Sequence, residues 1–305
     1  MKNSRVYVSK NGGANLTLSK DDLTRQVNKI ILDAHGGSII FVISALAGIT
    51  RLLDAIFLEM QKKNNRGAEN LFSAFTEMHL NVVRSLLSDN SRIFPQLEKY
   101  FAEIWAFIHK KSISNNPTMD QANLLKYGEL CSSLIFSKFI SSMKVCGNCL
   151  LLDARNLIIS NSHSYTEGKV ELNATVENIK FSAKKSRIIV TQGFIARDAD
   201  GCDTVLGYDG SDLTAAVIAY SLLKFGKKVN LTYWKDIPGV FKNLNDKSDG
   251  IFIIMKIPDY VEFAKHQTVP VRADAIGLLS GSDSQLSISI NSFKDLDGPG
   301  TIIRP

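Results

Sequence analysis

The first segment that could do chemistry lies near the amino terminus, where a lysine precedes two adjacent glycines. Lys10 directly follows a short apolar run at 6–9, and one residue separates it from the pair Gly12-Gly13. Adjacent glycines let the backbone approach a ligand closely, and their N–H groups can point at an anion. A lysine beside them supplies a compact positive charge, which suits a phosphoryl group in transit. The segment predicts phosphate chemistry or, as the simpler alternative, a Gly-Gly turn with a solvated lysine.

Three further segments with reactive or ligand-binding side chains also follow predicted strands. Ser44 and Thr50 lie between an apolar run and a helical pattern, and Gly210-Ser211-Asp212 opens another helix. Asp236 follows a third apolar run and precedes a Pro-Gly turn. Ligands of open parallel sheets bind at the carboxyl ends of the strands, and helix amino termini attract anions. The alternatives are helix capping and an ordinary loop.

The elements that must position these segments alternate between strands and helices. Apolar or β-branched runs predict strands at 6–9, 38–44, 150–153, 157–159, 186–192, 228–234, 250–255 and 287–290. Helical spacing predicts helices at 23–31, 211–225 and 261–265, with a mainly helical stretch at about 50–142. Ser19 is expected to cap the first helix and Gly36-Gly37 to end it. This alternation favours an α/β fold with a mainly parallel sheet.

The composition is that of an ordinary globular protein. The 305 residues suggest one large domain or two closely joined lobes. No apolar run of about 18 residues occurs, so we expect no membrane span, and nothing predicts a secretory signal. The net charge is +6, but lysines and arginines are spread along the chain. We therefore do not expect a nucleic-acid partner.

The cysteines allow two interpretations. Cys146 and Cys149 have the C-x-x-C spacing of redox and zinc sites, whereas Cys131 and Cys202 are isolated. A zinc site with four cysteine ligands needs a second pair, which is absent from the sequence. Structural thiols in a reducing cytoplasm are the preferred interpretation, and redox or metal use is the alternative.

Taken in order, the motifs of the chain resemble those of aspartate kinase, in the amino acid kinase family. The order is Lys-x-Gly-Gly, Ser-Ala-x-x-Gly-x-Thr, Tyr-Gly-Glu, Thr-Gln-Gly-Phe-Ile-Ala-Arg, Gly-x-x-Gly-Ser-Asp and Trp-x-Asp-x-x-Gly-Val, between Val6 and Ile303. The resemblance implies a three-layer α/β fold in a single domain at 1–305. It places a helical insert at about 50–142 and a nucleotide-side lobe at about 205–305.

The same resemblance implies an activity. Members phosphorylate the β-carboxylate of aspartate with Mg²⁺ and ATP, so an acyl phosphate of aspartate or a related amino acid is the expected product. A role in amino-acid biosynthesis and assembly as a homodimer would follow. The chain ends where the catalytic domain of this family ends, so we expect no regulatory domains and no feedback through them.

The resemblance also assigns roles to residues by their match to the family motifs. The implied catalytic residues are Lys10 and Asp212. The implied substrate-binding residues are Ser44, Thr50, Glu129, Tyr208 and Ser211. The implied nucleotide-binding residues are Gly12, Gly13, Gly210, Lys235, Asp236 and Phe241. No residue is assigned to a protein-bound metal ion.

The chain departs from the family pattern within the expected site. Tyr208 replaces an arginine that grips the substrate carboxylate, Asp209 replaces a glycine, and Val269 replaces a phosphate-binding lysine. Losing a buried arginine–carboxylate pair costs about 2–5 kcal/mol. Lys235, in place of a threonine, or Arg272 could compensate. An active kinase is the favoured hypothesis, and the alternative is a catalytically impaired relative that binds nucleotide or amino acid or modulates a partner.

Overall fold

The central element of the structure is a mostly parallel sheet. This computed structural model describes residues 5–88, 93–110, 114–143, 149–161, 164–182, 185–282 and 285–305. Eight strands follow the order β3-β5-β2-β1-β8-β10-β11-β9, and all neighbours are parallel except β10 and β11. These strands are β1 (Val6–Asn11), β2 (Ser38–Ile43), β3 (Cys149–Leu152), β5 (Ile188–Gln192), β8 (Val229–Lys235), β9 (Ile254–Lys256), β10 (Leu286–Ser292) and β11 (Thr301–Arg304).

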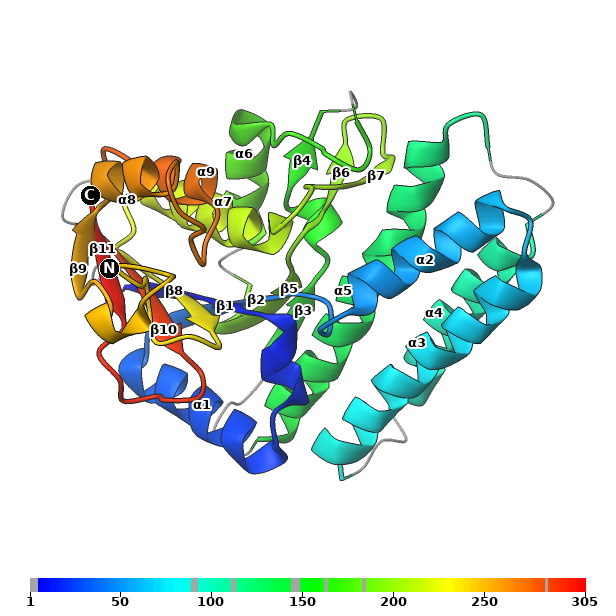
Figure 1. The fold of residues 1–305 in the computed structure, drawn as a ribbon, viewed down its shortest axis with the longest axis horizontal. Helices are drawn as coiled ribbons and strands as arrows, with labels where there is room; N and C mark the ends of the chain where they lie inside the picture. Colours follow the sequence, from blue (N-terminus) through cyan, green and yellow to red (C-terminus); the bar gives the residue numbers. More distant parts are fainter. Residues whose placement is uncertain are drawn as a thin grey trace.

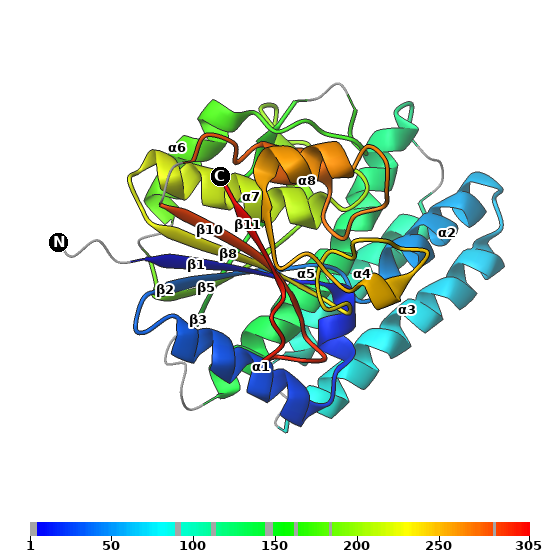
Figure 2. The same ribbon diagram turned by 60° about the vertical axis from the view of Figure 1, so that its left-hand side comes forward.

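Helices cover both faces of this sheet and form the outer layers. In Figure 2 the sheet is seen nearly edge-on, with α6, α7 and α8 on one side and α1 on the other. The helices are α1 (Lys20–Asp33), α2 (Ile49–Gln61), α3 (Asn65–Leu86), α4 (Phe94–Ile108), α5 (Pro117–Ser142), α6 (Leu172–Ser182), α7 (Gly210–Lys224), α8 (Ile257–Phe263) and α9 (Ala273–Gly277). The expected three-layer α/β fold with a mainly parallel sheet is confirmed.

Strand β2 shows why the sheet is buried on both faces. Ile39 and Phe41 belong to the core on the side of α1 and α5, whereas Ile40 and Val42 belong to the core under α7. Successive side chains of a strand point to opposite faces, so a strand between two helical layers is apolar at every position. The continuous apolar run at 38–44 predicted this correctly.

The first helix begins and ends as its sequence indicates. The Ser19 side chain accepts a hydrogen bond from the backbone N–H of Asp22 at 3.1 Å, which caps the amino terminus of α1. The helix ends at Asp33, and Gly36 takes a left-handed φ of 83° just beyond it. Glycine adopts this conformation without steric cost, so the chain can turn into β2.

The predicted helical stretch forms four helices, α2 to α5. Figure 1 shows α2, α3 and α4 at the end of the molecule away from β9 and β11. Helix α5 packs on β3 and β5 as well as on α2 and α4, so it is buried over most of its surface. This double coverage explains why α5 is not amphipathic, and it fixes the position of Glu129 near its middle.

Several predicted boundaries were wrong. The run at 250–255 is not a continuous strand: Gly250 has a φ of 75° after the 3₁₀ helix at Lys247–Asp249, and Ile251 forms only an isolated bridge with Phe241. Only Ile254–Lys256 pairs, as β9. A second sheet of three short strands, β4 (Ile159–Ser160), β6 (Ile195–Asp198) and β7 (Asp203–Val205), was not anticipated in this form. Strands this short carry little pattern, and tertiary contacts decide them.

Among the described residues, no helix is both long enough and apolar enough to cross a membrane. The proposed division into one domain with a nucleotide-side lobe at about 205–305 stays a prediction.

Candidate active site

Two lysines and one aspartate form a buried ion-pair group at the carboxyl end of the sheet. Lys10 lies within β1, between Val42 of β2 and Tyr233 of β8 in the register. Its Nζ is 2.8 Å from Oδ1 of Asp212, and the Nζ of Lys235 is 2.9 Å from Oδ2 of the same carboxylate. Neither Lys10 nor Asp212 is more than 6% exposed. One carboxylate therefore holds two ammonium groups beside the first turn of α7.

The charges of this group fit an anionic ligand. Burial would raise the pKa of Asp212, but Lys10 and Lys235 hold it below its ordinary value, so the carboxylate is ionised. Burial, and then the charge of Lys10, lowers the pKa of Lys235. Two ammonium groups and one carboxylate leave a net positive charge next to the positive end of a helix dipole. That combination attracts phosphate.

Glu129 is a second buried acid in the same region. It comes from α5, is 3% exposed, and its Oε1 accepts a hydrogen bond from the backbone N–H of Ala45 at 3.1 Å. Its Oε2 is buried and has no hydrogen-bond partner within the described part of the chain. Burial raises the pKa of Glu129 to about 8, against the smaller lowering effects of the Ala45 N–H and the Lys10 charge. An unpaired buried carboxyl oxygen of this kind is suited to a ligand ammonium group.

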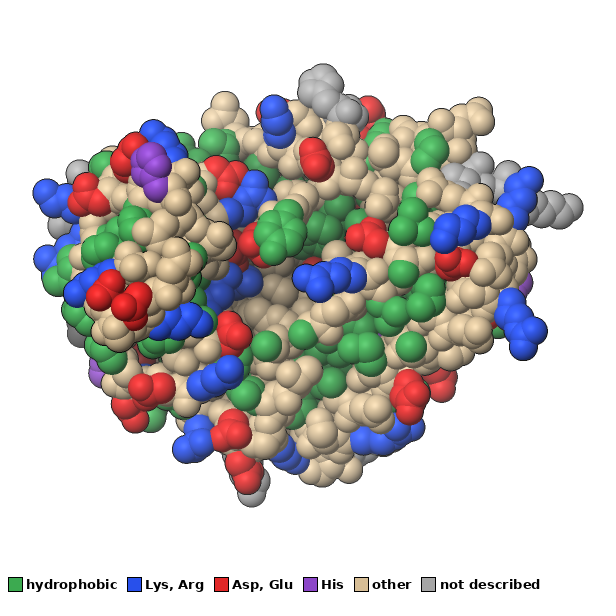
Figure 3. All heavy atoms as spheres, in the orientation of Figure 1, with side chains coloured by type: hydrophobic (Ala, Val, Ile, Leu, Met, Phe, Trp, Pro, Cys, Tyr) green, Lys and Arg blue, Asp and Glu red, His purple; other side chains and the backbone are tan. Residues whose placement is uncertain are grey.

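A cavity of about 540 Å³ brings many of the predicted residues together. The face drawn in Figure 3 is hollowed near its centre, and basic and acidic side chains gather around the hollow. The predicted site residues that line the cavity are Lys10, Ser44, Thr50, Glu129, Tyr208, Gly210 and Ser211. Asp212 lies behind Lys10 through their ion pair. The cavity thus joins the β1, β2, α5 and α7 segments that the sequence singled out separately.

Other predicted residues do not line this cavity. They are Gly12, Gly13, Lys235, Asp236 and Phe241. Lys235 reaches the group through Asp212, whereas Asp236 is exposed in the loop after β8. Phe241 forms a single β-bridge with Ile251, and the Lys247 ammonium lies 5.4 Å from its ring. The nucleotide-side assignments therefore stay predictions.

Sequence reasoning missed two residues of the cavity wall, Arg51 and Asp54. Both lie on α2 and line the cavity with Thr50. Asp54 accepts a hydrogen bond from Gln121 Nε2 at 2.9 Å. Their position directly after the Ser44–Thr50 segment, on the exposed side of a helix start, was the available signal.

The segment before α7 is shaped by an arginine. Arg272 Nη1 donates to the carbonyl oxygens of Leu206 at 3.2 Å and Tyr208 at 2.9 Å, while Nε and Nη2 bind the Asp274 carboxylate. With its donors engaged in this way, Arg272 holds the loop in place, so it is a poor candidate for replacing the missing phosphate-binding lysine. The Tyr208 side chain is left 87% exposed at the cavity edge.

Gly13 is required by a close approach of two loops. A Cβ atom at this position would lie 2.2 Å from the carbonyl oxygen of Ala45 and 2.5 Å from the nitrogen of Ala47. Both contacts are with backbone, which cannot move aside easily. Gly13 therefore packs the loop after β1 onto the loop after β2, and this contact helps to form the cavity.

A buried amide network involves Asn11 and Asn15, one on each side of the glycine pair. The Asn15 side chain donates to Asn11 Oδ1 at 3.4 Å and to Gln26 Oε1 at 3.2 Å, and Gln26 donates to Asn11 Oδ1 at 3.4 Å. Asn11 also donates to Ser9. The three amides support one another where α1 meets β1, so they act on the fold rather than on a ligand.

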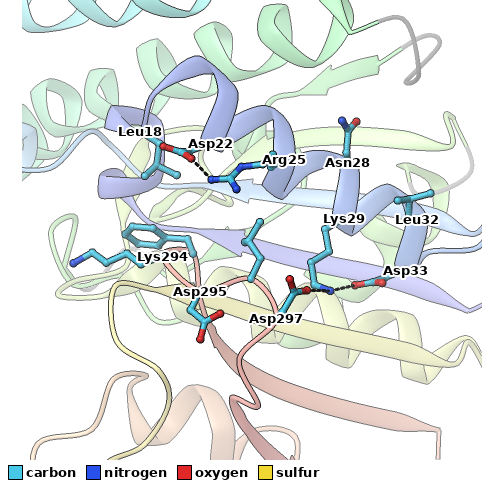
Figure 4. Close-up of a pocket in the computed structure, with 12 residues that line it drawn as sticks. Leu18, Asp22, Arg25, Asn28, Lys29, Leu32, Asp33, Lys294, Asp295 and Asp297 are labelled. Carbon is cyan, nitrogen blue, oxygen red and sulfur yellow. Dashed lines mark hydrogen bonds and ion pairs between the residues drawn. The ribbon is translucent and has the colours of Figure 1, made fainter.

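A larger cavity, of about 790 Å³, lies away from this group between α1 and the segment 293–297. Figure 4 shows Lys29 on α1 facing Asp33 and Asp297, with Nζ–O distances of 4.0 and 3.4 Å. The Asp297 side chain is 93% exposed. These solvent-exposed pairs are weak, and the cavity lacks the buried charges of the site above.

The cysteine predictions have a partial outcome. Cys131 is buried in α5, as a structural thiol would be, and burial raises its pKa. Cys146 lies outside the described residues, so the C-x-x-C hypothesis stays a prediction.

Comparison with known proteins identifies the amino acid kinase family over nearly the whole chain. The sequence profile of the amino acid kinase family matches residues 5–280. Lysine-sensitive aspartokinase 3 of Escherichia coli (strain K12) is 25% identical over 306 residues, which are 98% of this chain and 64% of the relative. The chloroplastic bifunctional aspartokinase/homoserine dehydrogenase 2 of Zea mays is 27% identical, over 91% of this chain and 30% of the relative. The chain thus spans less than two thirds of the length of either relative.

Solved structures share the fold. The structure of E. coli aspartokinase III in complex with aspartate and ADP matches with a TM-score of 0.84 at 22% identity, covering 98% of this chain and 64% of that one. Clostridium acetobutylicum aspartate kinase matches with a TM-score of 0.76 at 18% identity, over 97% of this chain and 62% of that one. With the profile match over residues 5–280, the shared fold and the buried lysine–aspartate group, the chain belongs to the amino acid kinase family.

Proposed function

We propose that the protein is an ATP-dependent kinase that phosphorylates the side-chain carboxylate of aspartate or a related amino acid. The observation that carries the proposal is the buried Lys10–Asp212–Lys235 group at the start of α7, which shares a cavity region with Glu129. E. coli aspartokinase III, which has this fold, was solved with aspartate and ADP. A role in amino-acid biosynthesis, a cytoplasmic setting and assembly as a homodimer belong to the same proposal.

In the proposed reaction an acceptor carboxylate oxygen attacks the γ-phosphorus of ATP. The bond to the β,γ-bridging oxygen breaks, and an acyl phosphate and ADP are formed. Lys10 stabilises the charge on the transferring phosphoryl group, and Asp212 positions the Lys10 ammonium for it. Lys235 adds a second cation beside the first, which could offset the missing phosphate-side lysine at Val269.

The remaining groups bind and orient the acceptor and the nucleotide. The free Oε2 of Glu129 would accept from the acceptor ammonium, while Ser44, Thr50 and Ser211 line the same cavity. Mg²⁺ prefers oxygen ligands and would be held by the nucleotide phosphates with Asp209, a cavity carboxylate to which no lysine is paired among the described residues. When bound, Mg²⁺ neutralises part of the phosphate charge. Gly12, Gly13, Gly210, Asp236 and Phe241 are proposed on the nucleotide side.

The direct test is turnover by the purified protein with Mg²⁺ and ATP against a panel of amino acids, with hydroxylamine to trap the acyl phosphate. We expect hydroxamate with aspartate or a close analogue. Lys10→Met keeps the apolar stem but removes the charge, so kcat should fall by at least about 10²-fold. Lys29→Met, which removes a surface cation from α1, is the matched control and should keep wild-type activity.

Three results would change the assignment. Normal turnover by Lys10→Met, with its fold checked by circular dichroism, would refute the role of Lys10. No turnover by the wild type, with ADP binding retained in calorimetry, would favour the catalytically impaired relative. If the wild type shows neither turnover nor nucleotide binding, the active kinase and a relative that binds nucleotide are both excluded, and a relative that binds amino acid or modulates a partner is left.

A further inference from the structure

Arg51 is an unpaired cation in the cavity wall. It lies in the first turn of α2, is exposed, and lines the cavity together with Lys10, Glu129 and Tyr208. No ion pair or hydrogen bond to its guanidinium occurs among the described residues. The acid one turn further along, Asp54, interacts with Gln121 instead.

The other cations near the cavity already have acidic partners. Lys10 and Lys235 share the Asp212 carboxylate. Arg272 is engaged by Asp274 and by loop carbonyl oxygens. Within the described wall of the cavity, Arg51 is therefore the one cation that has no acidic partner.

An acceptor with two carboxylates needs such a cation. One carboxylate must face the phosphoryl group near Lys10, and the ammonium group fits Glu129, so the second carboxylate shares the remaining cavity with the Asp54 carboxylate. A carboxylate without a cationic partner would be repelled there. The hydroxyl of Tyr208 can donate one hydrogen bond, whereas a guanidinium can bind both carboxylate oxygens.

We propose that Arg51 determines acceptor specificity by binding the α-carboxylate of an amino dicarboxylic acid, in place of an arginine at position 208. The inference rests on the proposed kinase function and adds a residue that determines its specificity. The acceptor is a free amino acid with an ionised α-carboxylate, not an amide or a peptide-linked residue.

The test compares two acceptors that differ only in the group that Arg51 would bind. Aspartate carries an α-carboxylate, and its α-carboxamide keeps the ammonium and β-carboxylate but is neutral at that position. Wild type should favour aspartate in kcat/KM, and Arg51→Ala should lower kcat/KM for aspartate by about 30- to 1000-fold. The value for the α-amide should change less than about threefold, because the surface substitution removes no contact to it.

Two further variants sharpen the comparison. Arg51→Lys should recover part of the preference for aspartate, because a point charge remains without the bidentate geometry. Arg66→Ala removes another exposed arginine from the first turn of a helix, α3, and should leave both acceptors unaffected. The KM for ATP should stay unchanged in all variants.

The failures of the two proposals can be told apart. If wild type phosphorylates aspartate and Arg51→Ala keeps the same preference over the α-amide, the assignment of Arg51 is wrong and the kinase function stands. If wild type turns over neither acceptor, the kinase function fails, and aspartate binding measured by calorimetry then tests the role of Arg51. If wild type binds aspartate and Arg51→Ala does not, the assignment of Arg51 is supported. If both bind aspartate equally, or if wild type does not bind it, the assignment is overturned.

Discussion

At the scale of single residues, the main feature is a carboxyl group buried without a full set of partners. Glu129 has one oxygen bound to the Ala45 N–H, and its other oxygen has no partner among the residues that the structure describes. Burial raises its pKa to about 8, so the group is protonated over much of the neutral range when no ligand is bound. An ammonium ligand requires the ionised form, and binding must then expel a proton.

This coupling predicts a pH dependence of acceptor binding. Below pH 8 each unit of acidification should reduce kcat/KM for the amino acid by up to about tenfold, and above pH 8 the value should level off. Initial rates from pH 6 to 9 measure this, with the KM for ATP as the control. Glu129→Gln should give lower activity and lose this dependence. A wild-type profile that is flat between pH 6 and 9 would contradict the role of Glu129.

At the scale of elements, the start of α7 combines an uncommon backbone conformation with the site. Asp209 precedes the helix with a φ of 52° and a ψ of 27°, and its side chain makes no capping hydrogen bond. Burial and the neighbouring Asp212 raise its pKa. The left-handed region favours glycine, and aspartate tolerates it better than most other residues. This explains how Asp209 can stand where the family motif has glycine.

The left-handed backbone at Asp209 predicts that glycine is more stabilising than alanine at this position, which is the reverse of their order inside a helix. Asp209→Ala should be about 1 kcal/mol less stable than Asp209→Gly, because alanine is strained at positive φ and glycine is not. Urea denaturation of the two variants measures the difference. Glu98, exposed within α4, provides the control, since glycine there should be less stable than alanine. The same order at both sites would mean that the backbone at 209 is not left-handed.

At the scale of the whole molecule, a cluster of charges joins the helical insert to the small sheet. Asp203 of β7 binds Lys126 of α5 at 2.7 Å and Arg155 at 2.8 Å, and Arg197 of β6 is 3.5 Å away. The Asp203 side chain is only 10% exposed. Burial would raise its pKa, but Lys126 and Arg155 hold it below the ordinary value. The cluster fixes α5, and with it Glu129, relative to the rest of the fold.

Removing the shared carboxylate should therefore destabilise the protein. Asp203→Asn leaves two partly buried cations without their partner, and we expect the free energy of unfolding at pH 7 to fall by about 2 kcal/mol or more. Because the folded pKa is lowered, this stabilisation is present above the unfolded pKa of 3.8 and is lost as pH falls further. Chemical denaturation measures both effects. Glu177→Gln, in an exposed pair with Lys180, should cost less than about 1 kcal/mol. If both variants lost the same free energy of unfolding, the cluster around Asp203 would not hold α5 to the small sheet.

The sequence by itself determined the features that short patterns encode. The apolar run at 38–44 and the Ser19 cap predicted their local structures, and the order of the motifs indicated the family. The glycine pair indicated a close backbone approach, and at Gly13 the approach observed is to the loop after β2. Local sequence is sufficient here because burial on two faces, capping and close backbone approach each restrict residue types at adjacent positions.

Only the tertiary structure decided which side chains meet. It placed Lys235 on the Asp212 carboxylate, engaged Arg272 in the loop before α7, and brought Arg51 and Glu129 into the wall of one cavity. It also restricted the predicted strand at 250–255 to pairing at Ile254–Lys256 and formed the short strands β6 and β7. The residues of the ion pairs and of the cavity lie far apart in the chain. The charge, the burial and the free hydrogen-bond donors of each side chain depend on neighbours that only the packing of the fold brings near.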